Sequence, residues 1–397
     1  MKNHINNACP VCSCKDVQMF MEIKRVPVYC NVLYRTREEA LRAPAGIIEL
    51  MFCNSCGHVY NRAFNHELMN YSQEYENTLD FSPRFREYIQ SLAGYLIDKY
   101  DLHEKTIIEI ACGKGDFLSL LCEMGGNRGI GFDPSYVPER PSNYNTEGRI
   151  TFIQDYYSQR YSDYKGDFIC CRHALEHIQF PDKFMDDIRQ SIGKQGDVAV
   201  FFEVPNVLYT LYDLGIWDLI YEHCSYFSKH SLGCLFARCG FEVNCLFDAF
   251  DGQYLCIEAR PQIDQSLQTL PDFYDEQANI SECIKVFAKT YYDKVSSWRS
   301  FIAKSSMKEK KPVVWGAGSK GVTFLNTLDL QNQIDYIIDI NPHKHGKYVA
   351  GTGQQVMPPE FLQTYNPDSV IVVNPIYLDE IKRIVKEMNV NCEFIVA

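Results

Sequence analysis

Runs of apolar residues divide the chain into regions with different predicted secondary structure. In the first, apolar and polar residues alternate over 17–28 and 46–53, which predicts strands with one buried face. Over 84–100 the apolar residues recur at helical spacing. Shorter apolar runs then predict buried strands at 106–111, 128–133, 150–155, 167–172 and 197–206. Strands alternating with helices in this way predict a doubly wound α/β sheet.

A second α/β pattern follows. Residues 279–304 read as one long amphipathic helix, and a polar, basic linker ends at Pro312. The strand 312–316, a glycine turn, a helix and two more strands come after it. About 85 residues remain from Lys311, which is short for a full dinucleotide domain. The expected domains are a β module at 1–70, an α/β domain at 71–260, and a bridging helix with a Rossmann-like domain at 261–397.

Composition narrows the possible functions. A hydrophobic content of 46 % suits buried cores, and a formal charge of −12 argues against general nucleic-acid binding. The N-terminus lacks a signal-peptide core, and no apolar run approaches the roughly 20 residues of a membrane span. Most of the 17 cysteines sit singly in apolar segments, where reduced cysteine packs as a small hydrophobe. We expect a soluble cytoplasmic protein with no membrane partner.

Two Cys-x-x-Cys pairs near the N-terminus depart from that pattern. The segments CPVC and CNSCG each lie in a turn beside Pro or Gly, and two such pairs can present four thiolates to zinc. Four thiolates leave no open position, so the predicted zinc is structural. Cys14 or His58 can replace a ligand, and a redox pair or unliganded cysteines remain the alternative. The predicted ligands are Cys9, Cys12, Cys53 and Cys56.

The first glycine turn, IIEIACGKGDF, follows the strand 106–111. Gly113 and Gly115 let the backbone approach a ligand at a helix N-terminus. The third glycine of a dinucleotide turn is missing, but Asp133 ends the next strand about 20 residues later, where an acid can bind ribose hydroxyls. Asp155 ends the strand after that. A ligand is therefore expected at the carboxyl ends of these strands.

The segment VLYTLYDLGIWDLIYEHCSYFSKHSL, residues 207–232, gathers aromatics, carboxylates and two histidines. Within it, Tyr221, Glu222, His223 and Tyr226 are the candidate catalytic group. A histidine with a neighbouring acid can act near neutral pH as a general base. Adjacent residues do not share a helix face, so the acid and the histidine are not expected to form a simple dyad in a helix. The alternative is that the histidine is a satisfied core or cap residue.

Three other residues are candidates for the site. His173 and His177 are four apart, which places both on one face if the segment is helical and also suits two metal ligands. We favour His177 as a substrate-pocket group, with the metal site as the lesser alternative. An aromatic run over 71–88 can fold over the mouth of the site as a lid. Within this run Tyr75 is a candidate contact, or packs as tyrosines more often do.

The second glycine turn, VVWGAGSKGVTF, has the full G-x-G-x-x-G spacing at Gly316, Gly318 and Gly321. Asp339 follows about 20 residues later at the end of a strand. NAD(P) binding is the direct interpretation. The short segment is better suited to holding a single nucleotide phosphate.

The motifs of the middle region, taken in order, resemble class I S-adenosylmethionine-dependent methyltransferases over about residues 81–260. They are E-x-x-C-G-x-G, the two strand-end aspartates and ALEHI. The resemblance implies that the glycines line the methionine part of the cofactor, the first aspartate holds the ribose and the second meets the adenine amino group. The implied cofactor-binding residues are Glu109, Gly113, Gly115, Asp133, Asp155 and His173.

Nearly the whole chain is similar to nucleotide-sugar C-methyltransferases, in particular the 3-C-methyltransferases of deoxysugar pathways. Four features carry this resemblance: the cysteine pairs, the methyltransferase core, YEHCSYFS, and the segment from WGAGSKG to DINPHKHGKYVAG. It implies an N-terminal zinc module, a class I methyltransferase sheet and a C-terminal Rossmann-like domain. An activated 4-keto-6-deoxyhexose is expected between the last two. The candidate substrate contacts are Gly316, Gly318, Lys320, Gly321 and Asp339.

The implied chemistry is methylation of carbon through an enolate. His223 or Glu222 removes the C3 proton, a tyrosine or histidine holds the C4 oxyanion, and the enolate attacks the sulfonium methyl group. The alternatives are an O-methyltransferase of a sugar or glycan and an NAD-binding fusion protein. The nucleotide, the sugar and the choice between monomer and dimer are left open.

Overall fold

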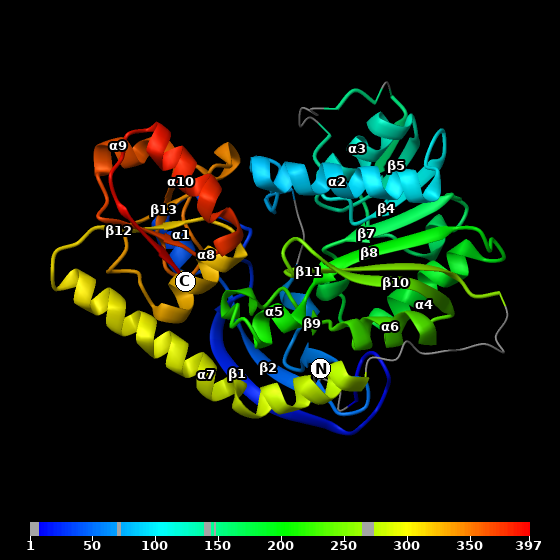
Figure 1. Ribbon diagram of the computed structural model, residues 1–397, viewed down its shortest axis with the longest axis horizontal. Coiled ribbons are helices and arrows are strands. Elements are labelled where there is room, and N and C mark those ends of the chain that lie inside the picture. The colour runs from blue at the N-terminus through cyan, green and yellow to red at the C-terminus, as the bar shows by residue number, and fades with distance from the viewer. Residues whose placement is uncertain (1–7, 70–72, 139–143, 147, 264–273) are drawn as a thin grey trace.

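The computed structural model describes residues 8–69, 73–138, 144–146, 148–263 and 274–397, and its strands form three sheets (Figure 1). The N-terminal sheet is antiparallel, in the order β1-β2-β3-β9. Its last strand comes from the insert at 207–232, far along the chain, so the N-terminal module is completed by the candidate catalytic segment. The strands are β1 (Val17–Pro27), β2 (Ala45–Cys53), β3 (Val59–Asn61) and β9 (Ser225–Tyr226).

The middle sheet has seven strands in the order β10-β11-β8-β7-β4-β5-β6. Strands β4 to β8 are parallel, and the last two strands along the chain form an antiparallel pair at one edge. The chain moves outward from β4 to β6 and then returns to β7 on the other side. The strands are β4 (Thr106–Ile110), β5 (Arg128–Phe132), β6 (Ile150–Ile153), β7 (Phe168–Arg172), β8 (Ala199–Pro205), β10 (Phe241–Ala249) and β11 (Tyr254–Pro261).

Helices cover both faces of this sheet, as Figure 1 shows. Phe201 of β8 is buried with α2 and α3, whereas Phe202, whose side chain points to the other face, is buried with α4 and α6. The predicted α/β fold class is therefore confirmed. The covering helices are α2 (Pro83–Tyr100), α3 (Asp116–Gly125), α4 (Pro181–Ile192) and α6 (Lys229–Arg238).

The segment after β7 differs from the helix that the sequence predicts. β7 ends at Arg172, and the backbone of His173 takes a positive φ of 50°. Only a single 3-10 turn, η3 (Leu175–His177), follows it. His173 and His177 therefore do not share one helix face, because the turn between them is not a continuous helix.

A long helix, α7 (Tyr274–Ser306), runs beside the N-terminal sheet to the C-terminal domain (Figure 1). That domain holds a five-stranded parallel sheet in the order β14-β13-β12-β15-β16. Each of its strands has only three or four residues, so five strands fit into this short segment. The strands are β12 (Pro312–Trp315), β13 (Tyr336–Ile338), β14 (Gln355–Met357), β15 (Ser369–Val372) and β16 (Glu393–Val396).

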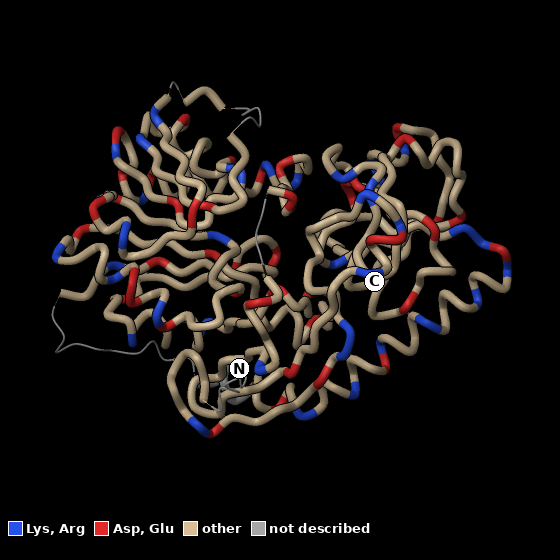
Figure 2. The backbone as a smooth tube through the Cα atoms, turned by 180° about the vertical axis from the view of Figure 1, so that it is seen from behind, with Lys and Arg blue, Asp and Glu red and all other residues tan. Residues whose placement is uncertain are grey.

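One apolar cluster joins the N-terminal sheet, the insert, α7 and the C-terminal domain. Trp217 of the insert packs edge-on against Phe324, with ring centroids 4.9 Å apart, and Phe287 of α7 is fully buried in the same cluster. Charged residues of both signs follow one another along α7 (Figure 2). Among the described residues, no helix has the length and hydropathy of a membrane span. The remaining helices and turns are α1 (Arg37–Leu41), η1 (His66–Leu68), η2 (Gln159–Tyr161), α5 (Val207–Leu211), η4 (Ile216–Asp218), α8 (Ser319–Leu328), η6 (Pro342–Lys344), η7 (Pro359–Phe361), α9 (Leu362–Tyr365), η8 (Pro375–Tyr377) and α10 (Leu378–Glu387).

Candidate functional site

The two cysteine pairs meet at one end of the N-terminal sheet. All four Sγ atoms lie within 4.8 Å of one another. Cys9 Sγ is 3.6 Å from Cys56 Sγ, and Cys12 Sγ is 3.5 Å from Cys53 Sγ. Ligands at the usual Zn–S distance of about 2.3 Å in a tetrahedron lie about 3.8 Å apart, so these thiols are compatible with a zinc site.

The two alternative ligands lie outside this group. Cys14 Sγ instead accepts a hydrogen bond of 3.4 Å from the backbone N–H of Asp16. His58 is fully buried, and its ring packs against Phe227 at 4.9 Å and Tyr60 at 6.0 Å. Burial lowers the pKa of His58 to about 3, which keeps the imidazole neutral beside the cysteines.

The first glycine turn closes on Asp133 at the end of β5. The N–H of Gly113 donates to Asp133 Oδ2 at 2.8 Å, and the N–H of Ser135 donates to Oδ1 at 2.7 Å. Gly113 and Gly115 have φ values of 57° and 87°, in the region that favours glycine. A Cβ on Gly115 would meet the ring of Phe152 at 2.5 Å. The turn therefore requires glycine for its conformation and for the close approach of Phe152.

Two buried acids stand near this turn. Burial raises the pKa of Glu109 to about 8 against the opposing effect of Arg172, and Glu109 Oε2 has no hydrogen-bond partner among the described residues. Glu203 of β8 is also fully buried, which would raise its pKa, but Arg172 and His173 outweigh burial and lower the pKa to about 2. Glu203 Oε1 lies 2.9 Å from Arg172 Nη2 and 2.5 Å from His173 Nε2. The predicted cofactor residue His173 is therefore held by a buried carboxylate.

Asp155 lies two residues beyond the end of β6, at the edge of the same row of strand ends. Its Oδ2 accepts a hydrogen bond of 2.6 Å from Tyr161 and pairs with Arg160. The row of strand ends thus presents Gly113, Asp133 and Asp155 from three adjacent strands. Such a row is where open α/β sheets bind their ligands.

A cavity of about 260 Å³ lies between the middle sheet and the C-terminal domain. Its walls include the segment 75–82, the loop after β7, the insert, the second glycine turn and part of the segment 373–381. Three predicted catalytic residues, Tyr75, His177 and His223, line it, as do the cofactor candidate His173 and all five substrate candidates. The cavity therefore collects predicted residues from segments that are far apart in the sequence.

Other members of the predicted catalytic group do not line this cavity. Tyr221 OH accepts a hydrogen bond of 2.9 Å from the N–H of Asn65, and Tyr226 OH donates to the carbonyl of Ile220 at 3.2 Å. The first bond joins the insert to the N-terminal module, and the second lies within the insert. Glu222 lies behind the wall, where its Oε1 accepts a hydrogen bond of 3.2 Å from the N–H of Cys30.

Glu222 is nevertheless connected to the cavity through Tyr75. Burial raises the pKa of Glu222 to about 8, opposed by hydrogen bonds from the backbone of Cys30 and Asn31 and from the Tyr75 hydroxyl. Tyr75 is itself buried, and its OH also accepts from Asn31 Nδ2 at 3.2 Å. If the Tyr75 oxygen takes up a proton from the cavity, the original phenol proton can therefore pass to Glu222.

His177 and His223 stand side by side on the wall, with ring centroids 4.9 Å apart. His177 Nδ1 lies 2.9 Å from the carbonyl oxygen of Glu222, which only accepts, so this nitrogen carries the proton. Burial lowers the pKa of His177 to about 4 and that of His223 well below its usual value. Both rings are therefore neutral near pH 7.

The second glycine turn repeats the geometry of the first. Asp339 Oδ2 accepts from the N–H of Ala317 at 2.7 Å, and Oδ1 accepts from the N–H of Asn341 at 2.8 Å. Gly316 has a φ of 104°, and a Cβ on Gly321 would lie 1.9 Å from the carbonyl oxygen of Gly316. The glycines are again required by the turn itself.

The difference between the turns is a buried lysine. Lys344 Nζ lies 3.1 Å from the carbonyl oxygen of Ala317 and 3.4 Å from Asp339 Oδ2. Lys320 Nζ lies 2.5 Å from Asp218 of the insert. Both lysines line the cavity, beside the N-terminus of α8, whose N-cap residue Gly318 provides no side-chain cap. This wall is electropositive.

Among the cavity residues that the sequence analysis did not predict are two buried charged groups, Glu176 and Lys344. Glu176 lies within the quoted ALEHI motif, between the two histidines, and its burial is the feature that the sequence did not reveal. Lys344 lies five residues after Asp339 in a polar loop, where a lysine is ordinarily solvated. Only the folded structure shows that both residues line the cavity.

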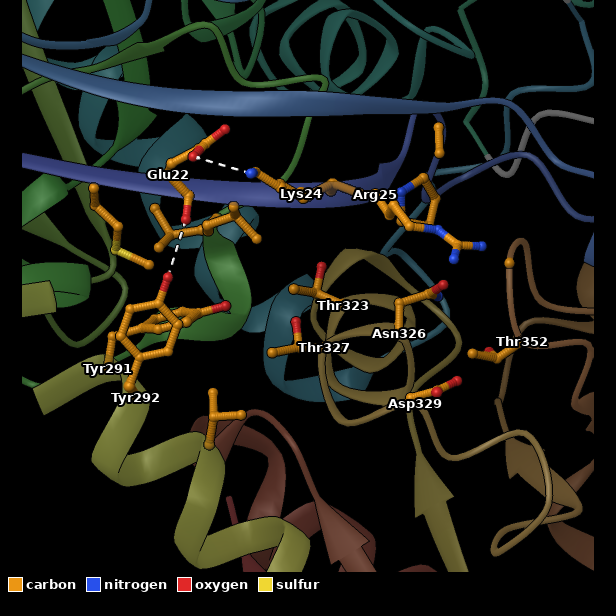
Figure 3. A pocket seen from close by; sticks show the side chains of 18 of the residues that line it. Glu22, Lys24, Arg25, Tyr291, Tyr292, Thr323, Asn326, Thr327, Asp329 and Thr352 are labelled. Carbon is orange, nitrogen blue, oxygen red and sulfur yellow. Dashed lines mark hydrogen bonds and ion pairs between the residues drawn. The ribbon is translucent and has the colours of Figure 1, made fainter. Parts of the chain in front are cut away.

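A larger cleft of about 870 Å³ lies elsewhere, between β1, α7 and α8. Figure 3 shows Glu22 of β1 paired with Lys24 at 3.6 Å, while the Tyr292 hydroxyl donates to the Glu22 carbonyl at 3.1 Å. None of the predicted site residues lines this cleft. We therefore assign the site to the smaller cavity, which is lined by the histidines and the second glycine turn.

Two family models match the chain. One described as "Methyltransferase domain" matches residues 81–246, and one described as "C-methyltransferase C-terminal domain" matches residues 264–397. Each covers less than half of the chain, and together they leave the cysteine pairs unmatched. The protein is therefore a methyltransferase, and the second match indicates transfer to carbon. No curated protein sequence matches significantly.

Similar solved structures are also methyltransferases. Magnesium protoporphyrin IX methyltransferase from Synechocystis PCC 6803 with bound SAH is 14 % identical with a TM-score of 0.35, and covers 47 % of this chain and 89 % of its own. The dimethyltransferase RosA from Streptomyces davawensis is 19 % identical with a TM-score of 0.33, and covers 47 % of this chain and 62 % of its own. These TM-scores are too low to carry an argument about this chain.

Proposed function

We propose that the protein is an S-adenosylmethionine-dependent C-methyltransferase that acts on a nucleotide-linked 4-keto-6-deoxy sugar by deprotonation at C3. The observation that carries this proposal is the cavity of about 260 Å³, which has the histidine wall of the methyltransferase sheet on one side and the electropositive second glycine turn on the other. A molecule with a reactive sugar at one end and a diphosphate at the other fits both walls.

The residues of the first turn fit the cofactor. Asp133 uses both oxygens for backbone N–H groups, but each carboxylate oxygen has a second lone pair, which leaves acceptors for ribose hydroxyls. Gly113 has nothing within 4 Å of the position of a Cβ, so its backbone is open to a ligand. When bound there, S-adenosylmethionine supplies an electrophilic methyl group on a sulfonium.

The second turn is better suited to phosphate than to NAD. In a dinucleotide site the strand-end acid binds ribose hydroxyls. Here Lys344 Nζ lies 3.4 Å from Asp339 Oδ2, so a buried ammonium group stands beside the acid where a ribose hydroxyl would bind. Lys344, Lys320 and the backbone N–H groups at the start of α8 instead provide donors for an anion. This supports the nucleotide-diphosphate end of the substrate and argues against the dinucleotide interpretation.

Methylation of carbon requires a base and a stabilised enolate. Two groups can take the C3 proton: His223, which lines the cavity directly, and Glu222, which reaches it through Tyr75. His177 donates its Nδ1 proton to the Glu222 carbonyl, which leaves its Nε2 as an acceptor, so the donor for the developing C4 oxyanion must be another group. General bases contribute roughly 10² to 10⁴ in rate.

The deprotonation step can be tested without methyl transfer. The enzyme is incubated with a 4-keto nucleotide sugar in heavy water without S-adenosylmethionine, and deuterium at C3 is followed by mass spectrometry. We expect exchange in the wild type. If the proton passes through Tyr75, the Glu222→Gln and Tyr75→Phe variants lose exchange. If His223 takes the proton directly, the His223→Asn variant loses it. Exchange that survives in both Glu222→Gln and His223→Asn would remove both residues from the base role.

A full turnover separates this proposal from methylation of oxygen. Labelled S-adenosylmethionine is supplied with a series of nucleotide-linked keto and hydroxy sugars, and the product is analysed for a C–CH₃ or an O–CH₃ group. Only keto sugars are expected to react, because only they form the enolate. A methyl ether as product would exclude the proposal.

We also propose that Cys9, Cys12, Cys53 and Cys56 hold a structural zinc ion. The S···S distances of 3.5 and 3.6 Å support a tetrahedral site, and four thiolates leave no position for a substrate.

A further inference from the structure

Three side chains that can bind a metal ion converge on the cavity wall. One ligand atom of each of Glu176, His177 and His223 lies within 4.8 Å of the corresponding atoms of the other two. All three line the cavity. Glu176 and His177 come from the turn after β7 and His223 from the insert, so the fold brings together two separate segments.

Two of these side chains have orphaned polar atoms. Glu176 Oε2 and His223 Nδ1 are buried and have no hydrogen-bond partner among the described residues. Glu176 as a whole is only 2 % exposed. An unsatisfied buried polar atom destabilises the folded state, and two on one wall point to a missing occupant.

The orientation of His177 indicates what the occupant is. Its Nδ1 donates to the Glu222 carbonyl at 2.9 Å, which leaves Nε2 as the nitrogen with the lone pair. A backbone carbonyl that fixes the tautomer in this way is typical of metal-binding histidines. Two imidazoles and one carboxylate form a donor set that binds divalent transition metals and leaves further positions open.

We propose that Glu176, His177 and His223 bind a divalent transition-metal ion on the wall of the substrate cavity. Two ligands about 2.1 Å from one ion lie at most about 4.2 Å apart, so the three side chains close slightly around it. Each lysine of the facing wall has an acid beside it, Asp218 for Lys320 and Asp339 for Lys344, which offsets part of the positive charge that Lys320 presents to His223. The open positions of the ion face the cavity.

The role of the ion rests on the proposed function. There it polarises the C4 ketone of the sugar, which is a typical task of a Lewis acid. The C3–H bond breaks and its proton passes to Tyr75 as the phenol proton moves to Glu222, which accepts it in the ionised form that prevails above about pH 8. The C3–CH₃ bond then forms as the S–CH₃ bond breaks, so the enolate charge cancels that of the sulfonium, and S-adenosylhomocysteine leaves with a neutral thioether sulfur. His223 is a ligand in this arrangement, so the proton takes the Tyr75 route.

Metal binding is tested first, without substrate. The full-length protein is treated with a weak chelator, titrated with Co²⁺ or Mn²⁺, and followed by calorimetry, visible absorption and elemental analysis. We expect one equivalent to bind in addition to the ion held by the cysteines. Glu176→Gln and His223→Asn are each expected to weaken this binding by at least 10-fold, whereas Cys53→Ser leaves it in place.

Glu258→Gln is the matched control, because Glu258 is fully buried in the middle sheet and paired with Lys99 at 2.6 Å. It is expected to bind the second equivalent as the wild type does. The site is refuted if only one equivalent binds at millimolar metal, or if the second equivalent is unchanged in both Glu176→Gln and His223→Asn.

The catalytic role is tested second, by deuterium exchange at C3 with and without the second ion. Exchange that rises on adding metal, and does not rise in Glu176→Gln, supports the role. An ion that binds without altering exchange would overturn the role. Absence of exchange with every keto sugar would instead tell against the proposed function, and leave the binding result standing.

Discussion

Replacing Glu222 by glutamine is expected to make the folded protein more stable at alkaline pH. The carboxyl group is fully buried, and burial raises its pKa from the ordinary 4.5 to about 8 despite hydrogen bonds from Cys30, Asn31 and Tyr75. The folded state therefore holds this proton more tightly than the unfolded state. As the pH rises from 4.5 towards 8, the unfolded carboxyl ionises freely and the folded one does not, so the folded state loses stability.

The magnitude follows from the pKa. One pH unit corresponds to 1.36 kcal/mol, so keeping the Glu222 proton lowers the free energy of unfolding, relative to acidic pH, by about 2 kcal/mol at pH 6 and about 4 to 5 kcal/mol near pH 8. Glutamine has the shape of the protonated acid and keeps an oxygen for the N–H of Cys30. The advantage of Glu222→Gln over the wild type should therefore grow by about 2 kcal/mol between pH 6 and pH 8.

Urea unfolding, followed by tryptophan fluorescence at pH 6, 7 and 8, measures this difference. Glu258→Gln is the control, because it removes a carboxylate that is hydrogen-bonded to Tyr95 at 2.7 Å and paired with Lys99. It should be destabilised at every pH. A stability difference between Glu222→Gln and the wild type that is the same at pH 6 and pH 8 would refute the assigned burial.

Further predictions concern the metal and the two glycine turns. Cys53→Ser should lose bound zinc and unfold at lower temperature, as measured by elemental analysis and calorimetry; zinc retained at one equivalent would contradict the assigned ligands. Asp133→Ala should weaken S-adenosylmethionine binding by at least 10-fold in calorimetry, because it removes the ribose acceptors and releases the turn at Gly113. Lys344→Met should weaken binding of a nucleoside diphosphate by roughly 10-fold or more while leaving S-adenosylmethionine binding unchanged; equal loss of both ligands would indicate general misfolding of the cavity.

Local sequence patterns were enough to predict most of the strands and both glycine turns. The strand predicted at 106–111 is β4, and the long helix predicted at 279–304 lies within α7. These elements depend on hydrophobic periodicity and on glycine conformation, which are properties of neighbouring residues. The prediction failed after β7, where the positive φ of His173 interrupts what the sequence presents as a helix.

The candidate site was predicted less completely, because its members face the cavity only through long-range packing. Tyr221, Glu222 and His223 are consecutive, yet only His223 lines the cavity, since the insert forms a turn before it joins the N-terminal sheet through β9. Lys344 was missed because nothing in its local sequence distinguishes it from a solvated lysine.

The sequence by itself determined the two α/β patterns, the two glycine turns and the cysteine pairs, because each depends on the chemistry of residues close together in the chain. Only the tertiary structure decided what these parts form together. The strand β9 joins the insert to the N-terminal module, a shared apolar core fixes the C-terminal domain against both, and these contacts enclose the cavity. The sequence did not predict these contacts because burial of apolar surface is non-directional. It brings distant segments together, but no local sequence pattern indicates which segments will pack against each other.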